Sequence, residues 1–181
     1  MTLLNVLRTN PAAALPTEGY VVDVIAGRVV MTPNTPDQDR TLFAVRGQLH
    51  ERLGPEADTI SHVLVDFTQD TALAPDLAVL APGATPHGHT YSCVDLRAVV
   101  EYASVRQDVF DFGTKPAVYA RFGVSACLII DPYAASCVLL ENPGPTGYGA
   151  RGETPFGEPV WLRLGDGQAV ELDTSAFPTA P

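Results

Sequence analysis

Short apolar segments bounded by glycine, proline and polar residues run through the middle of the chain, which predicts a strand-rich fold. Some segments alternate apolar and polar positions, as half-buried strands do, and others are continuously apolar, as strands buried on both faces are. The predicted strands cover residues 20–25, 28–31, 61–67, 77–81, 96–103, 126–131 and 136–141, followed by a terminal hairpin of 160–164 and 168–172.

Two segments have the spacing of helices instead. Leu42, Val45, Leu49 and Leu53 recur every three or four residues, which predicts an amphipathic helix that starts near Pro36-Asp37 and ends at Gly54-Pro55. A second helix is predicted within 107–122, with Gly123 as its stop. Because this helix joins strands 96–103 and 126–131, those strands can lie side by side in parallel. The predicted fold class is α/β (mixed α+β), a mixed β-sheet flanked by helices.

The same pattern suggests how the chain is organised. Residues 1–19 are weakly patterned and are expected to form an arm or a short helix with a linker. Residues 20–141 would form the main domain, beginning with a hairpin that turns at Ala26-Gly27. Residues 142–159 are rich in Gly and Pro and are expected to be a loop. With the terminal hairpin they would form an extension, 142–181, packed on the same domain.

Composition narrows the class of protein. The chain has 181 residues, 46% of them hydrophobic and 18% charged, which fits one folded domain and excludes disorder throughout. Its net charge of −10 argues against a broad basic face that grips duplex DNA. We find no secretory signal, no apolar run of membrane-spanning length and no metal-type cysteine spacing, so a reduced, cytoplasmic location without membrane contact is expected.

Three acidic residues stand at or inside apolar segments: Asp23 in VVDVI, Asp76 before LAVLA and Glu101 in AVVEYA. Burial of a carboxylate is unfavourable unless something compensates for its charge, and a hard divalent cation such as Mg²⁺ or Mn²⁺ is one such compensator. Lys115, the single lysine of the chain, is predicted near the start of the second helix. Two acids and a lysine from neighbouring elements are typical of a metal-dependent phosphodiesterase site.

The order of these motifs resembles the Uma-two family of restriction endonucleases, which belongs to the PD-(D/E)xK nuclease superfamily. The resemblance runs from about Tyr20 to Val138 and rests on the hairpin, PDLAVL, VVEYAS, DFGTK, AVYARFGV and IIDP. It implies a restriction-endonuclease-like fold in which Pro75-Asp76 and Glu101 bind the metal and Asp23 is the acid of the first hairpin.

Further positions correspond to the family pattern. The lysine usual in E-x-K would fall at Ala103, and the resemblance places it instead at Lys115, four residues after Asp111. Tyr119, Gly123-Val124, Ser104 and Asp131-Pro132 also match. The chain departs from the pattern at Asp39, where the family commonly has histidine. Pro116 disfavours helical backbone at the preceding residue, which predicts that Lys115 lies just outside the helix.

Each candidate also has a structural explanation. Asp76 could cap a turn, Glu101 could be an edge acid in solvent, Lys115 could be an ordinary surface lysine and Asp23 could form a surface ion pair. Asp108 and Asp111 are expected to be solvated or capping acids.

Three hypotheses for the function therefore remain open. The first is a metal-dependent endonuclease that hydrolyses nucleic-acid phosphodiester bonds, with Asp76 and Glu101 binding the metal and Lys115 positioning the attacking water. The second is a catalytically inactive nuclease-fold scaffold or partner-binding protein, and the third is an enzyme acting on a small phosphate ester. A homodimer is expected, because the sheet has open edges and Trp161 could serve as a dimer contact or as hairpin core.

Overall fold

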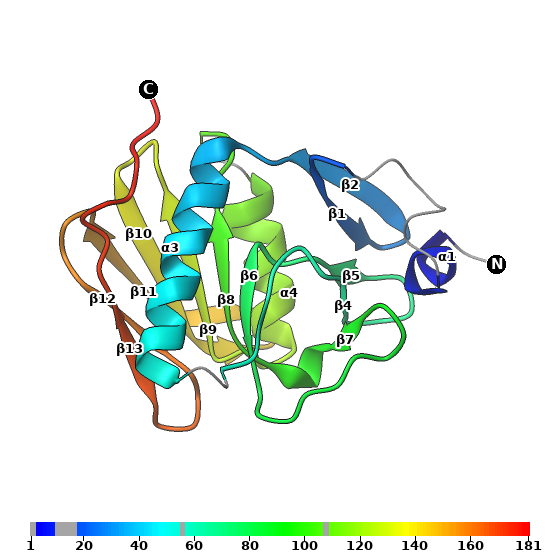
Figure 1. The fold of residues 1–181 in the computed structure, drawn as a ribbon. Coiled ribbons are helices and arrows are strands. Elements are labelled where there is room, and N and C mark those ends of the chain that lie inside the picture. Colours follow the sequence, from blue (N-terminus) through cyan, green and yellow to red (C-terminus); the bar gives the residue numbers. More distant parts are fainter. Residues whose placement is uncertain (1–2, 10–17, 55–56, 107–108) are drawn as a thin grey trace.

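A computed structural model describes residues 3–9, 18–54, 57–106 and 109–181, and Figure 1 shows their arrangement. The helical elements are α1 (Leu3–Thr9), α3 (Pro36–Leu53), the 3₁₀ turn η1 (Cys93–Asp95), the π-helical turn η2 (Phe110–Thr114) and α4 (Lys115–Arg121). The first strands are β1 (Tyr20–Ile25), β2 (Arg28–Pro33), β3 (Thr59–Ile60), β4 (Val65–Asp66), β5 (Ala72–Leu73) and β6 (Leu77–Leu80). The later strands are β7 (Tyr91–Ser92), β8 (Leu96–Tyr102), β9 (Ala126–Asp131), β10 (Ser136–Gly144), β11 (Gly147–Pro155), β12 (Val160–Arg163) and β13 (Ala169–Leu172).

A six-stranded mixed sheet in the order β11-β10-β9-β8-β6-β3 forms the centre of the molecule. Strands β8 and β9 run parallel, with Ala98 opposite Ala126, and the other neighbouring pairs are antiparallel. The parallel pair is joined through α4, as the sequence predicts. The predicted fold class is therefore confirmed.

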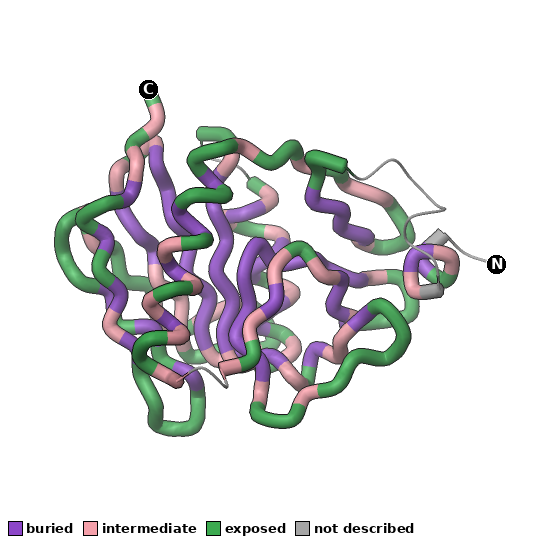
Figure 2. Tube along the Cα trace, in the orientation of Figure 1, coloured by how far each residue is buried: buried purple, intermediate pink, exposed green. Residues whose placement is uncertain are grey.

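The two faces of this sheet are covered by different elements (Figures 1 and 2). On one face, Leu42, Val45 and Leu49 of α3 pack together with the β12–β13 hairpin on alternate residues of β6, β8 and β9. On the other face, Tyr119 of α4 and residues of β4 and β5 pack on the intervening residues, such as Val99 and Ile129. Because the sheet is covered on both faces, its central strands are continuously apolar, and an acid on them is buried.

A second sheet, in the order β2-β1-β5-β4-β7, lies beside the first. Its β1–β2 hairpin turns at Ala26 and Gly27, both of which have positive φ values, 48° and 75°. Glycine adopts this conformation without steric penalty, which explains the turn expected there. Strand β5 pairs with β1 through Val24 and Ala72, and so brings the first hairpin next to the segment that leads into β6.

Two local predictions are wrong. Residues 61–67 do not form one strand, because His62 has a left-handed backbone (φ 56°) that separates β3 from β4. The loop predicted over 142–159 holds only for its last four residues: β10 and β11 form a long antiparallel hairpin up to Pro155, with Gly144 opposite Gly147 at its tip. The glycines of β11 are compatible with a strand there because β11 is the edge of the sheet, where few cross-strand side-chain contacts are needed.

The three cysteines, Cys93, Cys127 and Cys137, are free and buried. Trp161 is 52% exposed on β12, so the interpretation of Trp161 as hairpin core is wrong. Its alternative role as a dimer contact stays a prediction. Asp108 lies outside the described residues.

Candidate active site

Strands β6 and β8 bring Asp76 and Glu101 to one face of the central sheet. The strands are antiparallel, with Leu77 opposite Val100, so continuing this register by one residue sets Asp76 opposite Glu101. Residues directly opposite in an antiparallel pair project from the same face. This is the face that α4 covers, and the two acids are 3% and 0% exposed. The interpretation of Glu101 as an edge acid in solvent is therefore wrong.

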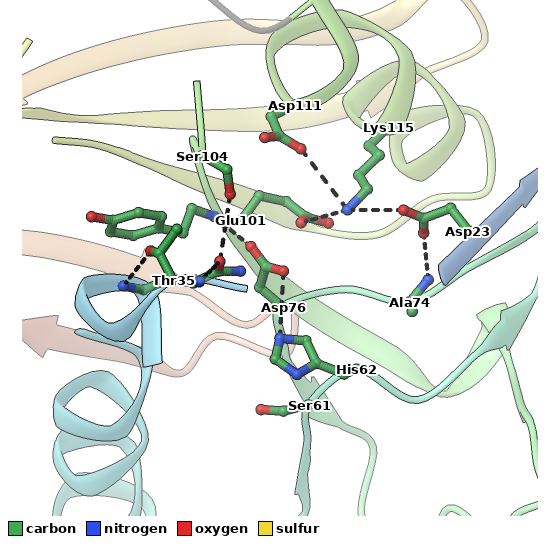
Figure 3. Close-up of polar contacts among 12 residues, drawn as sticks. Asp23, Thr35, Ser61, His62, Ala74, Asp76, Glu101, Ser104, Asp111 and Lys115 are labelled. Carbon is green, nitrogen blue, oxygen red and sulfur yellow. Dashed lines mark hydrogen bonds and ion pairs between the residues drawn. The ribbon is translucent and has the colours of Figure 1, made fainter. Parts of the chain in front are cut away.

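Asp23 approaches the same place from the second sheet (Figure 3). It lies on β1 and is fully buried, which excludes a surface ion pair. One carboxylate oxygen, Oδ1, accepts a hydrogen bond of 2.7 Å from the backbone N–H of Ala74, just before Asp76 in the chain. The other oxygen, Oδ2, accepts no hydrogen bond from any described residue.

Lys115 points its ammonium group between these carboxylates. The Nζ atom donates a hydrogen bond of 2.9 Å to Glu101 Oε2 and lies 3.4 Å from Asp23 Oδ2. The side chain is 3% exposed, so Lys115 is not an ordinary surface lysine.

The backbone around Lys115 also differs from the prediction. Lys115 is helical (φ −62°, ψ −51°) and begins α4, so the expectation that it lies outside the helix is wrong. Pro116 is in the first turn of α4, where a proline is tolerated, and the π-helical turn η2 precedes it. Lys115 is therefore held by regular backbone on both sides.

Two further side chains of the same helical region complete the network. Asp111 of η2 is buried, and its Oδ1 lies 3.9 Å from Lys115 Nζ. The expectation of a solvated acid at Asp111 is therefore wrong, and its alternative role as a capping acid stays a prediction. The hydroxyl of Tyr119, a fully buried residue of α4, donates a hydrogen bond to Glu101 Oε1. Both oxygens of Glu101 thus accept hydrogen bonds from one helix.

Asp76 is held by different partners. Its Oδ2 accepts a hydrogen bond of 2.8 Å from the backbone N–H of Tyr102, the residue that follows Glu101. On the opposite side, His62 Nε2 lies 3.6 Å from Asp76 Oδ1, and the imidazole is about one-third exposed (Figure 3). Asp76 is thus the acid of the cluster that contacts a partly exposed side chain.

The electrostatics of the cluster follow from burial and from an imbalance of charge. Burial alone would lower the pKa of Lys115, but the surrounding carboxylates, Glu101 first, raise it well above its usual range, so the ammonium form persists. Burial raises the pKa of Asp23, against the opposing effect of Lys115. Four carboxylates, those of Asp23, Asp76, Glu101 and Asp111, surround one ammonium group. The cluster therefore has more acidic than basic groups.

The carboxylate oxygens of this cluster are ligands of the type that a hard cation prefers. Its oxygen atoms come from carboxylates on separate strands, and Asp23 Oδ2 is a buried oxygen without a hydrogen bond. In the described part of the chain, however, no three acidic, histidine or cysteine side chains are arranged as a finished ligand set. Lys115 lies among the acids instead, within ion-pair distance of Asp23 and Glu101.

Several residues near the cluster were not singled out by their chemistry in the sequence. His62 lies inside the segment 61–67 that the sequence predicts as a strand, and its contact with Asp76 depends on the fold. Gln38 is buried and caps α3 together with Thr35, and its Oε1 lies 3.4 Å from the hydroxyl of Ser104. Tyr119 matches a family position in the sequence, but its hydrogen bond to Glu101 follows only from where α4 packs on the sheet.

Comparison with known proteins agrees with this architecture. The crystal structure of a putative nuclease belonging to DUF820 from Anabaena variabilis superposes with a TM-score of 0.67 at 14% sequence identity, and 94% of each chain is covered. At that identity the likeness concerns the fold. No curated protein matches the chain. Among the described residues, no helix has the length and apolar character needed to cross a membrane.

The family model of Uma2, described as putative restriction endonuclease, matches residues 13–168. This range is wider than the resemblance noted from Tyr20 to Val138, because it also includes the rest of β10, β11 and β12, and it ends just before β13. The chain belongs to the Uma2 family, the Uma-two family indicated by its motifs.

Proposed function

We propose that this protein is a metal-dependent nuclease in which Asp76 and Glu101, together with Asp23, hold Mg²⁺ or Mn²⁺, and Lys115 positions the attacking water. The observation that supports this most strongly is the excess of buried carboxylates over the single ammonium group, with Asp23 Oδ2 held only by an ion pair of 3.4 Å to Lys115 Nζ. A divalent cation would offset that excess. Membership in the Uma2 family and the nuclease-like fold are consistent with it.

Each residue of the cluster would have a separate role. Lys115 would orient a water molecule toward the scissile phosphorus and stabilise negative charge that develops on the phosphate oxygens. Tyr119 would fix the rotamer of Glu101, because its hydroxyl donates to one oxygen while Lys115 donates to the other. A bound metal ion would supply Lewis-acid polarisation of the phosphate.

A second candidate is the catalytically inactive nuclease fold, and one observation favours it. Lys115 already pairs with Glu101 and lies close to Asp23, and such a network can be a structural ion-pair cluster without metal. The two candidates differ in whether the protein binds a divalent cation and cuts a phosphodiester. A homodimer and a cytoplasmic location remain part of the proposal in either case.

The test is cleavage of end-labelled single-stranded and duplex DNA and RNA with Mg²⁺, Mn²⁺ or EDTA. We expect metal-dependent cleavage that falls to background in Asp76→Asn and Glu101→Gln. Glu158→Gln, which changes an exposed carboxylate in the turn before β12, is the matched control and should retain cleavage. If no substrate is cut at any metal concentration, the inactive fold is the correct account.

A further inference from the structure

His62 links the carboxylate cluster to two surface clefts. Its ring contacts Asp76, and it is about one-third exposed. One cleft, of about 130 Å³, is lined by Asp39, Leu42, Phe43, Arg46, Ser61 and His62. The other, of about 250 Å³, is lined by Leu7, Tyr20, Val22, Val63, Leu64, His89 and again His62. His62, which contacts Asp76, therefore lines both clefts, and Figure 3 shows His62 and Ser61 on that side of the site.

Each cleft carries an exposed aromatic residue. Phe43 on α3 is 79% exposed, and Tyr20 on β1 is 45% exposed. These two aromatic side chains lie on separate elements, on either side of His62. Exposed aromatic rings suit flat partners that stack on them. Nucleobases are such partners, and stacking tolerates any base because every base has a π-face.

The smaller cleft offers one cationic side chain, that of Arg46, to a phosphate. Arg46 donates a hydrogen bond to the Ser61 hydroxyl, and in the described part of the chain it forms no ion pair with a carboxylate. Other arginines are paired with acids, as in Arg8–Asp66, Arg40–Asp37, Arg97–Asp166, Arg151–Glu153 and Arg163–Glu141. Asp39 in the same cleft offsets the charge of Arg46, so binding there would depend on stacking more than on electrostatics.

We propose that these clefts bind a single-stranded polynucleotide, with one base on Phe43, another on Tyr20, a phosphate at Arg46 and the strand passing His62 beside Asp76. The inference rests on the proposed nuclease function and specifies its substrate class. A duplex fits less well, because its bases are stacked inside and its binding depends on many phosphate contacts, which a chain of net charge −10 does not offer.

The test measures binding separately from cleavage. Fluorescence anisotropy in EDTA follows labelled oligonucleotides of about 12 residues, as single-stranded DNA, single-stranded RNA and duplex DNA. We expect the single strands to bind more tightly than the duplex. Phe43→Ala should weaken that binding roughly tenfold, and Phe43→Leu, which keeps apolar bulk but removes the ring, should weaken it as well. Trp161→Ala removes an exposed aromatic residue on β12 and should leave binding unchanged.

The salt dependence tests Arg46 independently. A single strand held at one phosphate should give a slope of log K against log salt of about −0.7, and Arg46→Gln should bring the slope close to zero. Tighter binding of the duplex, or equal binding by the wild type and both Phe43 variants, overturns the inference.

The outcomes separate this inference from the proposed function. If Phe43→Ala keeps both cleavage and affinity for single strands, the proposal that the clefts bind a single strand is wrong and the nuclease assignment stands. Phe43-dependent binding of single strands with no cleavage in Mg²⁺ or Mn²⁺ supports the clefts and overturns the nuclease assignment.

Discussion

The ammonium group of Lys115 lies 2.9 Å from the carboxylate of Glu101, although fourteen positions separate the two residues in the chain. The contact forms because β8 carries Glu101 on the sheet face that α4 covers, and α4 begins at Lys115. The same ammonium group lies 3.4 Å from Asp23, on a strand of the second sheet. Lys115 therefore connects the two sheets through charge.

Replacing Lys115 with methionine removes the ammonium group and so tests its contribution to both stability and cleavage. The variant leaves buried carboxylates without their ammonium partner. We therefore expect its free energy of unfolding, measured by urea denaturation in EDTA, to be about 3–5 kcal/mol lower than that of the wild type. Arg121→Met, an exposed change at the end of the same helix, should cost less than about 0.5 kcal/mol. Equal stability of Lys115→Met and wild type would contradict the described network. Cleavage by Lys115→Met should fall by roughly 100-fold or more.

Tyr119→Phe tests the hydroxyl that donates to Glu101. Loss of a buried hydrogen bond to a charged acceptor should lower the free energy of unfolding by about 1.5–3 kcal/mol in the metal-free protein. Tyr148→Phe is a matched control, because the Tyr148 hydroxyl donates to the backbone carbonyl of Val124, a neutral acceptor. That change should cost only about 0.5–1.5 kcal/mol. If Tyr148→Phe lowers the free energy of unfolding more than Tyr119→Phe does, the hydrogen bond assigned from Tyr119 to Glu101 is wrong.

The buried Asp23 predicts how stability changes with pH. Burial raises the pKa of Asp23 in the folded protein above its ordinary value, so between these two pKa values the folded state binds more protons than the unfolded state. Deprotonation of Asp23 therefore lowers the free energy of unfolding of the metal-free protein as the pH rises above about 4. Asp23→Asn removes the titration, and its free energy of unfolding should depend less on pH than that of the wild type over this window. Denaturation in EDTA at successive pH values measures the difference, and parallel curves would contradict the prediction.

A divalent cation should stabilise the folded protein. Binding to the native state alone raises the free energy of unfolding by about 2.7 kcal/mol at a ligand concentration one hundred times Kd. We expect Mn²⁺ to raise the melting temperature of wild type and of Glu158→Gln. The melting temperature of Asp76→Asn should not respond, and a response equal to that of wild type would place the ion elsewhere.

The sequence was sufficient for the central strands β6, β8 and β9, because they are buried on both faces and carry little but apolar residues. It was also sufficient for α3, where Leu42, Val45 and Leu49 mark the buried face. The β10–β11 hairpin was missed because its glycines and prolines resemble a loop, and only the position of β11 at the sheet edge makes them compatible with a strand.

The acids of the candidate site could be selected from the sequence because a carboxylate in an apolar segment is unusual. Their partners could not be selected in the same way. Lys115 was predicted outside the helix from local proline chemistry, whereas the preceding π-helical turn carries regular backbone into Pro116. The contact between His62 and Asp76 depends on how β3, β4 and β6 pack, and no local pattern encodes it.

Calorimetric titration of Mn²⁺ into the metal-free protein shows whether the buried carboxylates around Lys115 bind a divalent cation. We expect measurable binding heat for the wild type, no heat for Glu101→Gln, and wild-type heat for Glu158→Gln. Absence of binding by the wild type, or unchanged binding by Glu101→Gln, would contradict this expectation and leave the cluster around Lys115 as a structural ion-pair network.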